Sequence, residues 1–105
     1  RVKRAGDKAV AAWARRNATT LRQLAGQVSM LDDLGDTGRT SATNLGAALG
    51  TDDPADLLDP LAATRPHLTG PHPGIAEQVT EIGERSDQVR RNAINTRRQT
   101  YDERR

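Results

Sequence analysis

Two histidines in a proline-rich stretch are the residues best suited to metal chemistry. His67 and His72 each follow a proline, and Asp52, Asp53 and Asp59 lie upstream in the same region. A usable zinc site needs three or four ligands held in place by neighbouring hydrogen bonds. Neither the spacing of these residues nor a helical frame supplies such a set. We therefore interpret both histidines as exposed loop residues and predict no metal site.

Patterns for covalent or acid–base catalysis are also missing. Ser29, Ser41 and Ser86 have no histidine close in sequence and no Gly-x-Ser-x-Gly turn, and the chain contains no cysteine. Neighbouring carboxylates such as Asp32 and Asp33 point apart on a helix, and helix capping explains them more simply. We therefore predict that the chain is not an enzyme and binds no cofactor.

Cationic residues near the two chain ends are the feature best suited to bind a ligand. Such clusters attract nucleic-acid phosphates or acidic protein surfaces. Asp7, Asp102 and Glu103 lie among the cations, so solvated helix faces are the competing interpretation. The candidate set is Arg1, Lys3, Arg4, Lys8, Arg15, Arg90, Arg91, Arg97, Arg98, Arg104 and Arg105.

Trp13, Ile94 and Tyr101 are the candidate contact residues for another protein chain. Tryptophan concentrates at the energetic centres of interfaces, and Trp13 is the only one here. Ile94 and Tyr101 lie seven residues apart, off the main apolar seam of their segment. Trp13 can equally anchor packing within the chain, so the sequence leaves both roles open.

The composition indicates one small helical domain covering residues 1–105. Leu, Ile and Val together number 18 and Phe is absent, so much of the core must consist of small side chains. A core of this kind is marginal in so short a chain, and we expect a partner or oligomerisation to support it.

Other features of the composition indicate where the protein is found in the cell and what kind of genome encodes it. No segment has the roughly 20 apolar residues that span a bilayer, so we expect a soluble protein and favour the cytoplasm. The preference for Arg over Lys, with abundant Ala, Gly and Asp, is typical of a GC-rich bacterial genome. Because the chain begins at Arg1, we expect a processed product or part of a longer protein.

Residues 2–34 are predicted to form one long helix. Asn17 is the polar break in its seam, and Gly35 is expected to end the helix in a left-handed conformation. A cationic stripe on another face, which we expect to meet solvent or an acidic partner, recurs every seven residues at Arg1, Lys8, Arg15 and Arg22. The seam positions alternate steps of four and three residues: Val10, Ala14, Asn17, Leu21, Leu24, Val28 and Leu31.

The middle of the chain, rich in Gly, Pro, Thr and Asp, is predicted to hold two short helices, at about 38–49 and 54–63. Asp53 is a suitable N-cap for the second, with Pro54 at the first helical position. Pro60 is expected to kink or restart that helix. Residues 65–73 carry three prolines and are predicted to be a loop.

Residues 74–103 are predicted to form a second long helix. Its acidic residues lie in the first half and most of its arginines in the second, which complements the helix dipole. The seam positions again alternate steps of four and three: Ile75, Val79, Ile82, Ser86, Val89, Ala93, Thr96 and Thr100.

Taken together, these elements predict an all-α fold: an antiparallel hairpin of two long helices with two short helices in the connection, able to assemble as a dimeric helical bundle. Such a hairpin gathers the cationic chain ends at one tip and seven aspartates of residues 29–72 at the other. We therefore predict a non-catalytic interaction or oligomerisation module within a larger assembly. Its expected partner is a second copy, as a homodimer, or another helical protein. The alternative is a nucleic-acid-binding accessory or regulatory protein that uses the arginine-rich end.

Overall fold

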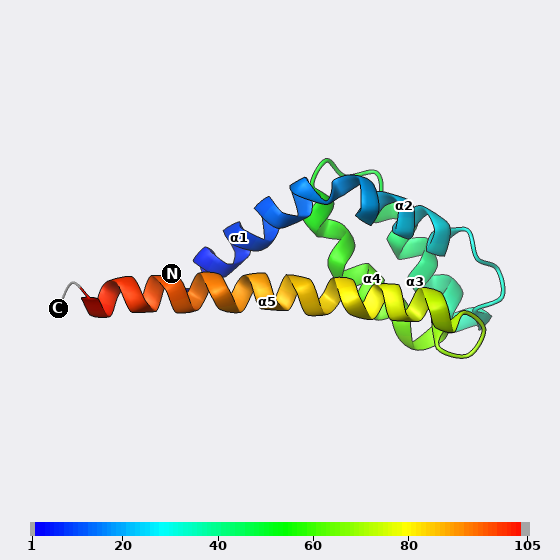
Figure 1. Ribbon diagram of the computed structural model, residues 1–105. Helices are drawn as coiled ribbons and strands as arrows, with labels where there is room; N and C mark the ends of the chain where they lie inside the picture. The colour runs from blue at the N-terminus through cyan, green and yellow to red at the C-terminus, as the bar shows by residue number, and fades with distance from the viewer. Residues whose placement is uncertain (1, 104–105) are drawn as a thin grey trace.

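The chain is all-helical in the computed structural model, which describes the backbone of residues 2–103 and the side chains of residues 5–96. No strand occurs in that range, and no helix in it combines the length and apolar character that a membrane crossing requires. Figure 1 shows the long helix α5 running the length of the molecule, with the other helices gathered along one side. The elements are α1 (Val2–Arg16), α2 (Ala18–Ser29), α3 (Gly35–Ala48), the 3-10 helix η1 (Pro54–Leu57), α4 (Leu58–Leu68) and α5 (Pro73–Glu103).

An asparagine divides the N-terminal helical segment in two. The prediction of one helix over 2–34 is wrong, because α1 ends at Arg16, α2 begins at Ala18, and α2 itself ends at Ser29. Asn17 has a φ of −111° and a ψ of 20°, and its side-chain amide donates a hydrogen bond of 2.8 Å to the Trp13 carbonyl. This bond offers the backbone an alternative to regular helix. The helical path therefore bends at Asn17 (Figure 1).

The start of the middle region follows the predicted capping. The Asp53 carboxylate accepts a hydrogen bond of 3.0 Å from the Ala55 amide, and Pro54 occupies the first helical position of η1. Gly35 adopts the expected left-handed conformation, with a φ of 77°, but it is the first residue of α3 rather than the end of the preceding helix. The first short helix therefore starts three residues earlier than predicted.

The predicted loop over 65–73 is wrong in its first half. Helix α4 continues through Pro66 to Leu68, and only residues 69–72 connect it to α5. A proline inside a helix costs about 3 kcal/mol. Leu61 and Leu68 lie seven residues apart on one face of α4 and are both fully buried, and burying a leucine contributes about 1.5–3 kcal/mol. Burial of this face offsets the cost of Pro66.

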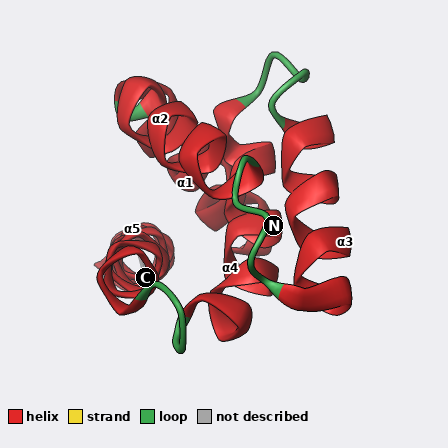
Figure 2. Cartoon of the chain, turned by 90° about the vertical axis from the view of Figure 1, so that its right-hand side faces the viewer, coloured by secondary structure: helices red, strands yellow, loops and turns green. Residues whose placement is uncertain are grey.

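The core lies at one end of the molecule, where α2, α3, η1 and α4 converge. Figure 2 shows α4 in the middle of this group, with α3 on one side and α5 on the other. Its largest fully buried apolar side chains are leucines from each of these four elements, joined by Val28. The N-terminal seam prediction is confirmed at Val10, Ala14, Leu21, Leu24 and Val28, all of which are buried.

Away from this core, α1 lies along the C-terminal half of α5 (Figure 1). The two helices approach closely at Gly6, where an added Cβ would lie 2.8 Å from Arg90 Cγ and 3.5 Å from Ile94 Cδ1. An ion pair between Asp7 and Arg90 joins the same two helices. A glycine and a charge pair thus fix α1 where large apolar side chains are scarce.

A glycine also sets the packing of α3 on α4, and we predict opposite effects of two Gly→Ala substitutions within α3. A Cβ at Gly38 would lie 2.5 Å from Leu34 Cβ and 3.1 Å from His67 Cβ, so Gly38→Ala is expected to lower the free energy of unfolding by about 1–3 kcal/mol. At the exposed Gly46 the nearest atom is 3.9 Å away, so Gly46→Ala is expected to raise it by about 1 kcal/mol through helix propensity. Urea unfolding of both variants measures these changes, and equal effects would contradict this packing.

Candidate functional site

Two of the three predicted partner-contact residues are engaged within the fold. Trp13 is half-buried and packs against the apolar core. Its backbone carbonyl accepts a hydrogen bond from the Asn17 side-chain amide. Ile94 is half-buried on α5 beside Gly6 of α1. The side chain of Tyr101 lies outside the described residues. The structure therefore places Trp13 and Ile94 in intramolecular contacts, and both side chains keep part of their surface exposed.

Four of the predicted cations have described side chains, and they differ in exposure. Arg90 is half-buried and paired with Asp7, whereas Lys8, Arg15 and Arg91 are exposed. Lys8 and Arg15 belong to α1, and Arg91 belongs to α5. The side chains of the remaining predicted cations lie outside the described residues, namely Arg1, Lys3, Arg4, Arg97, Arg98, Arg104 and Arg105.

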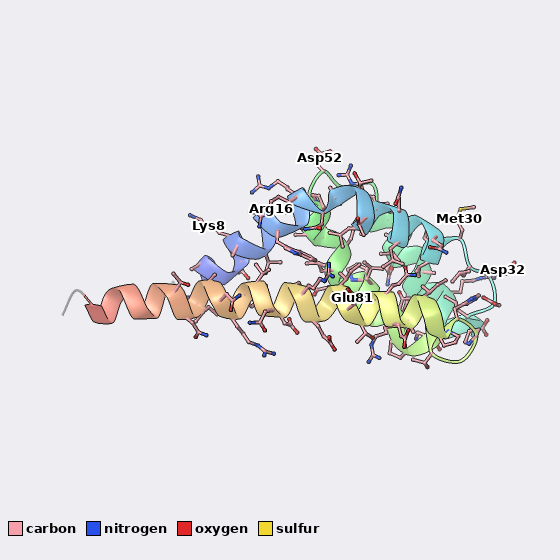
Figure 3. All side chains as sticks on the ribbon, in the orientation of Figure 1. Lys8, Arg16, Met30, Asp32, Asp52 and Glu81 are labelled. Carbon is pink, nitrogen blue, oxygen red and sulfur yellow. The ribbon has the colours of Figure 1, made fainter. Side chains whose placement is uncertain are left out.

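Aspartates of the middle region lie beside α1 rather than only at the far tip. Asp53 and Asp59 line an open hollow of about 410 Å³ together with Lys8 and Arg90. The Arg22 guanidinium lies 3.5 Å from the backbone carbonyl of Asp52. In Figure 3, Asp52 lies near Arg16, at a distance from Asp32 at the tip. The predicted separation of charges is thus incomplete, because aspartates of residues 52–59 lie beside Lys8 of α1 and Arg22 of α2.

The histidines have separate partners and do not converge. His67 is half-buried against Gly38, and His72 bonds both carboxylate oxygens of Asp33 at 2.9 Å. Among the described residues, no three His, Cys, Asp or Glu side chains come together as metal ligands. The His72–Asp33 contact joins the turn after α2 to the turn before α5, a role that the sequence does not indicate.

A hollow separates α2 from α5. Beyond the bend at Asn17, α2 packs on α3 and η1, whereas α5 packs on α1 and α4. The resulting opening, about 240 Å³ in volume, has Leu24 and Ile82 as its apolar part and amide or charged groups around them. Its full lining is Thr20, Gln23, Leu24, Gln27, Gln78, Glu81, Ile82 and Arg85.

A second hollow continues along the same side of α5, next to α1. It has a volume of about 490 Å³ and contains no charged side chain. Ile82 of the first hollow and Val89 of the second lie seven residues apart, which places them on one face of the helix. One side of α5 is therefore open beside both α2 and α1. The residues lining the second hollow are Ala5, Ala9, Val89, Asn92, Ala93 and Thr96.

The open side of α5 carries a regular row of polar residues that sequence analysis missed. The row alternates steps of three and four residues, so its members lie on one face of the helix, and every member is exposed. Its members are not apolar, so a search for hydrophobic periodicity does not detect them. The row consists of Gln78, Glu81, Arg85, Gln88, Asn92 and Asn95.

Comparisons with known proteins identify no relative of this chain. No protein-family model, no curated protein and no solved structure matches this chain.

The His72–Asp33 contact makes a testable contribution to stability. The hydrogen bond from His72 lowers the pKa of the Asp33 carboxyl below that of an ordinary aspartate. A lowered pKa in the folded state stabilises the fold above the ordinary aspartate pKa, and this stability is lost as pH falls through the lowered value. We expect Asp33→Asn to reduce the midpoint temperature of unfolding near neutral pH and to have a vanishing effect at strongly acidic pH.

Asp32→Asn is the matched control, because the Asp32 carboxylate makes no hydrogen bond or ion pair among the described residues. Thermal unfolding of both variants over a series of acidic and neutral pH values provides the measurement. An effect of Asp33→Asn that stays constant across that series would contradict the assignment.

Proposed function

We propose that this chain is a non-catalytic helical interaction module that self-associates, within a larger assembly, through the open side of α5. The observation that supports this proposal is the row Gln78 to Asn95, which is exposed on one face of α5 and is left uncovered by α1, α2 and α4. A helix face that its own chain leaves uncovered can pack against a second helix.

The chemistry of the open side suits a reversible contact. Ile82 and Val89 are half-buried along one edge of the row, and the row itself offers amides and a Glu81–Arg85 ion pair. Non-obligate interfaces are on the whole about as apolar as the rest of a protein surface. A polar row with an apolar edge therefore suits partners that separate and rejoin.

The proposed assembly is a homodimer in which α5 of each copy contributes to a dimeric helical bundle. Within each copy we propose that α1 and α5 act as the two arms of an antiparallel hairpin, held at Gly6 and by the Asp7–Arg90 pair. Burying the edge formed by Ile82 and Val89 would add apolar contact to a core that is confined to one end of the molecule.

Self-association predicts a concentration-dependent mass. We expect sedimentation equilibrium to show a shift from monomer to dimer between micromolar and millimolar protein. The double variant Gln88→Asp with Asn92→Asp should shift the equilibrium toward monomer, because it places carboxylates on the proposed contact at exposed positions. The matched control carries Thr43→Asp with Asn44→Asp, at exposed positions of α3, and should behave as the unmodified protein. An unmodified protein that stays monomeric at millimolar concentration would contradict the proposed function.

Nucleic-acid binding through the arginine-rich end is the alternative, and a salt series separates it from self-association. Binding to phosphates weakens steeply with salt, with a slope of log K against log salt of about −0.9 per phosphate contacted on duplex DNA. Because Arg90 is engaged by Asp7, and Asp53 and Asp59 line a hollow with Lys8, we expect these two cations to contribute little to any binding of duplex DNA. Binding with a slope of about −3 or steeper would favour the alternative.

A further inference from the structure

We propose that the Arg16–Asn17 peptide bond is a processing site for an endoprotease that cleaves after arginine, and that cleavage there turns α1 into a separable peptide. This inference goes beyond the proposed self-association and does not depend on it. The observations that carry it are the break in backbone hydrogen bonding at Asn17, the exposure of the residues around it, and the distribution of Lys and Arg along the chain.

Basic residues are absent from the longer connections between the helices. Over residues 5–96, every Lys and Arg lies within a helix, and only Arg16 is directly followed by a residue outside one. Arg15 precedes it, so two guanidinium groups lie on the N-terminal side of the bond. A protease whose recognition pocket holds a guanidinium with a carboxylate therefore meets its residue type beside non-helical backbone at this position alone in that range. Neither Lys nor Arg occurs in residues 30–34, 49–53 or 69–72.

The backbone hydrogen bonds of the helix are interrupted around this bond. The Asn17 amide donates to the Trp13 carbonyl at 3.1 Å, and the Asn17 carbonyl accepts from the Leu21 amide at 3.0 Å. Among the described residues, the carbonyls of Arg15 and Arg16 accept no backbone hydrogen bond from α2. The backbone on both sides of the bond therefore lacks part of the hydrogen bonding that holds a regular helix.

The segment around the bond contributes no side chain to the core. None of residues 15–20 is buried, whereas Ala14 and Leu21 on either side are fully buried. Figure 3 shows Arg16 close to the bend between α1 and α2. Susceptibility to proteolysis depends on the burial and hydrogen bonding of the backbone concerned. Because residues 15–20 have no buried side chain, local opening of this segment costs little free energy.

The other described cations lie inside uninterrupted helices. Arg22 of α2 follows the buried Leu21, and Arg39 of α3 follows the buried Gly38. The three described arginines of α5 lie within a single helix of 31 residues. Opening any of these sites breaks helical hydrogen bonds on both sides of the arginine. Because proteolysis of a folded chain follows the population of the open form, we expect cleavage at these sites to be slower.

Cleavage adds one water molecule across the peptide bond. The Arg16 carbonyl carbon takes the hydroxyl and the Asn17 nitrogen takes the hydrogen, and at neutral pH a proton then passes from the new carboxyl group to the new amine. A carboxylate thus forms at the C-terminus of α1 and an ammonium group at the N-terminus of α2. Each charge opposes the dipole of its own helix, which favours fraying of both new ends.

The contacts that hold α1 are not cut by this reaction. Helix α1 packs mainly on α5 and η1, with the close approach at Gly6 and the Asp7–Arg90 ion pair. Without the covalent link, this packing depends on concentration, because the effective concentration of the tethered helix is lost. An isolated helix of 15 residues is also marginal in water. Cleavage therefore changes α1 from a fixed part of the fold into a cover that leaves α5 on dilution.

Limited digestion of the intact chain with trypsin tests the site. We expect the first cut within residues 5–96 to yield a fragment that begins at Asn17, identified by its mass. The double variant Arg15→Gln with Arg16→Gln should slow the loss of chains intact over that range by about tenfold or more. The matched control is Thr43→Arg, which places an arginine at an exposed position inside α3 and should add no early cut. Circular dichroism checks that both variants keep their helices. A first cut elsewhere in residues 5–96, or cleavage at position 43 as fast as at Arg16, would overturn the proposed site.

Gel filtration of the cleaved protein tests whether α1 becomes separable. We expect the peptide of residues 1–16 to elute with the fragment of residues 17–105 at high protein concentration and apart from it after dilution, while the larger fragment keeps its helical circular dichroism. A peptide that stays bound at every dilution would contradict separability. Loss of helical structure from the larger fragment would contradict it as well.

Discussion

The bend at Asn17 is the constraint on which the rest of the structure depends. The amide of this residue bonds the Trp13 carbonyl and separates α1, which packs on α5, from α2, which packs on α3 and η1. A straight helix from residue 2 to residue 29 would continue in the direction of α1. Because the path bends, the leucines of α2 reach the core at one end of the molecule, and a hollow opens beside α5.

Several cations of this protein have acidic neighbours in the same chain. Arg90 pairs with Asp7, Arg85 pairs with Glu81, and Lys8 shares a hollow with Asp53 and Asp59. A net charge of +2 therefore does not translate into a continuous basic surface over the described residues. Arg91 is exposed and has no ion-pair partner among them, and the same holds for Arg15, Arg39 and Arg65.

The sequence predicts the helical class and much of the buried face, because these follow from local pattern. Leu21, Leu24 and Val28 recur at helical spacing and are buried, and the Asp53–Pro54 pair starts a helix as its capping chemistry predicts. Asn17 is visible in the sequence as a polar residue within an apolar seam. Whether such a residue is tolerated in a continuous helix or breaks it depends on where the following segment packs, which local pattern does not contain.

Two further features depend on contacts between distant residues. Helix α4 continues through Pro66 because Leu68 is buried by neighbouring elements, a gain that outweighs the local preference against proline. The candidate interaction face on α5 consists of polar residues, so hydropathy gives no signal for it. Its exposure becomes apparent only when α1 and α2 are placed.

The central claim is that the open side of α5 is the surface through which copies meet, and the accessibility of a single thiol tests it directly. Cysteine placed at Gln88 reports on that side, and cysteine placed at Asn44 reports on the exposed face of α3, in a chain with no other cysteine. The account predicts that the rate of thiol modification at position 88 falls as protein concentration rises, while the rate at position 44 stays constant. A rate at position 88 that does not change with concentration, or protection at position 44 instead, would contradict it.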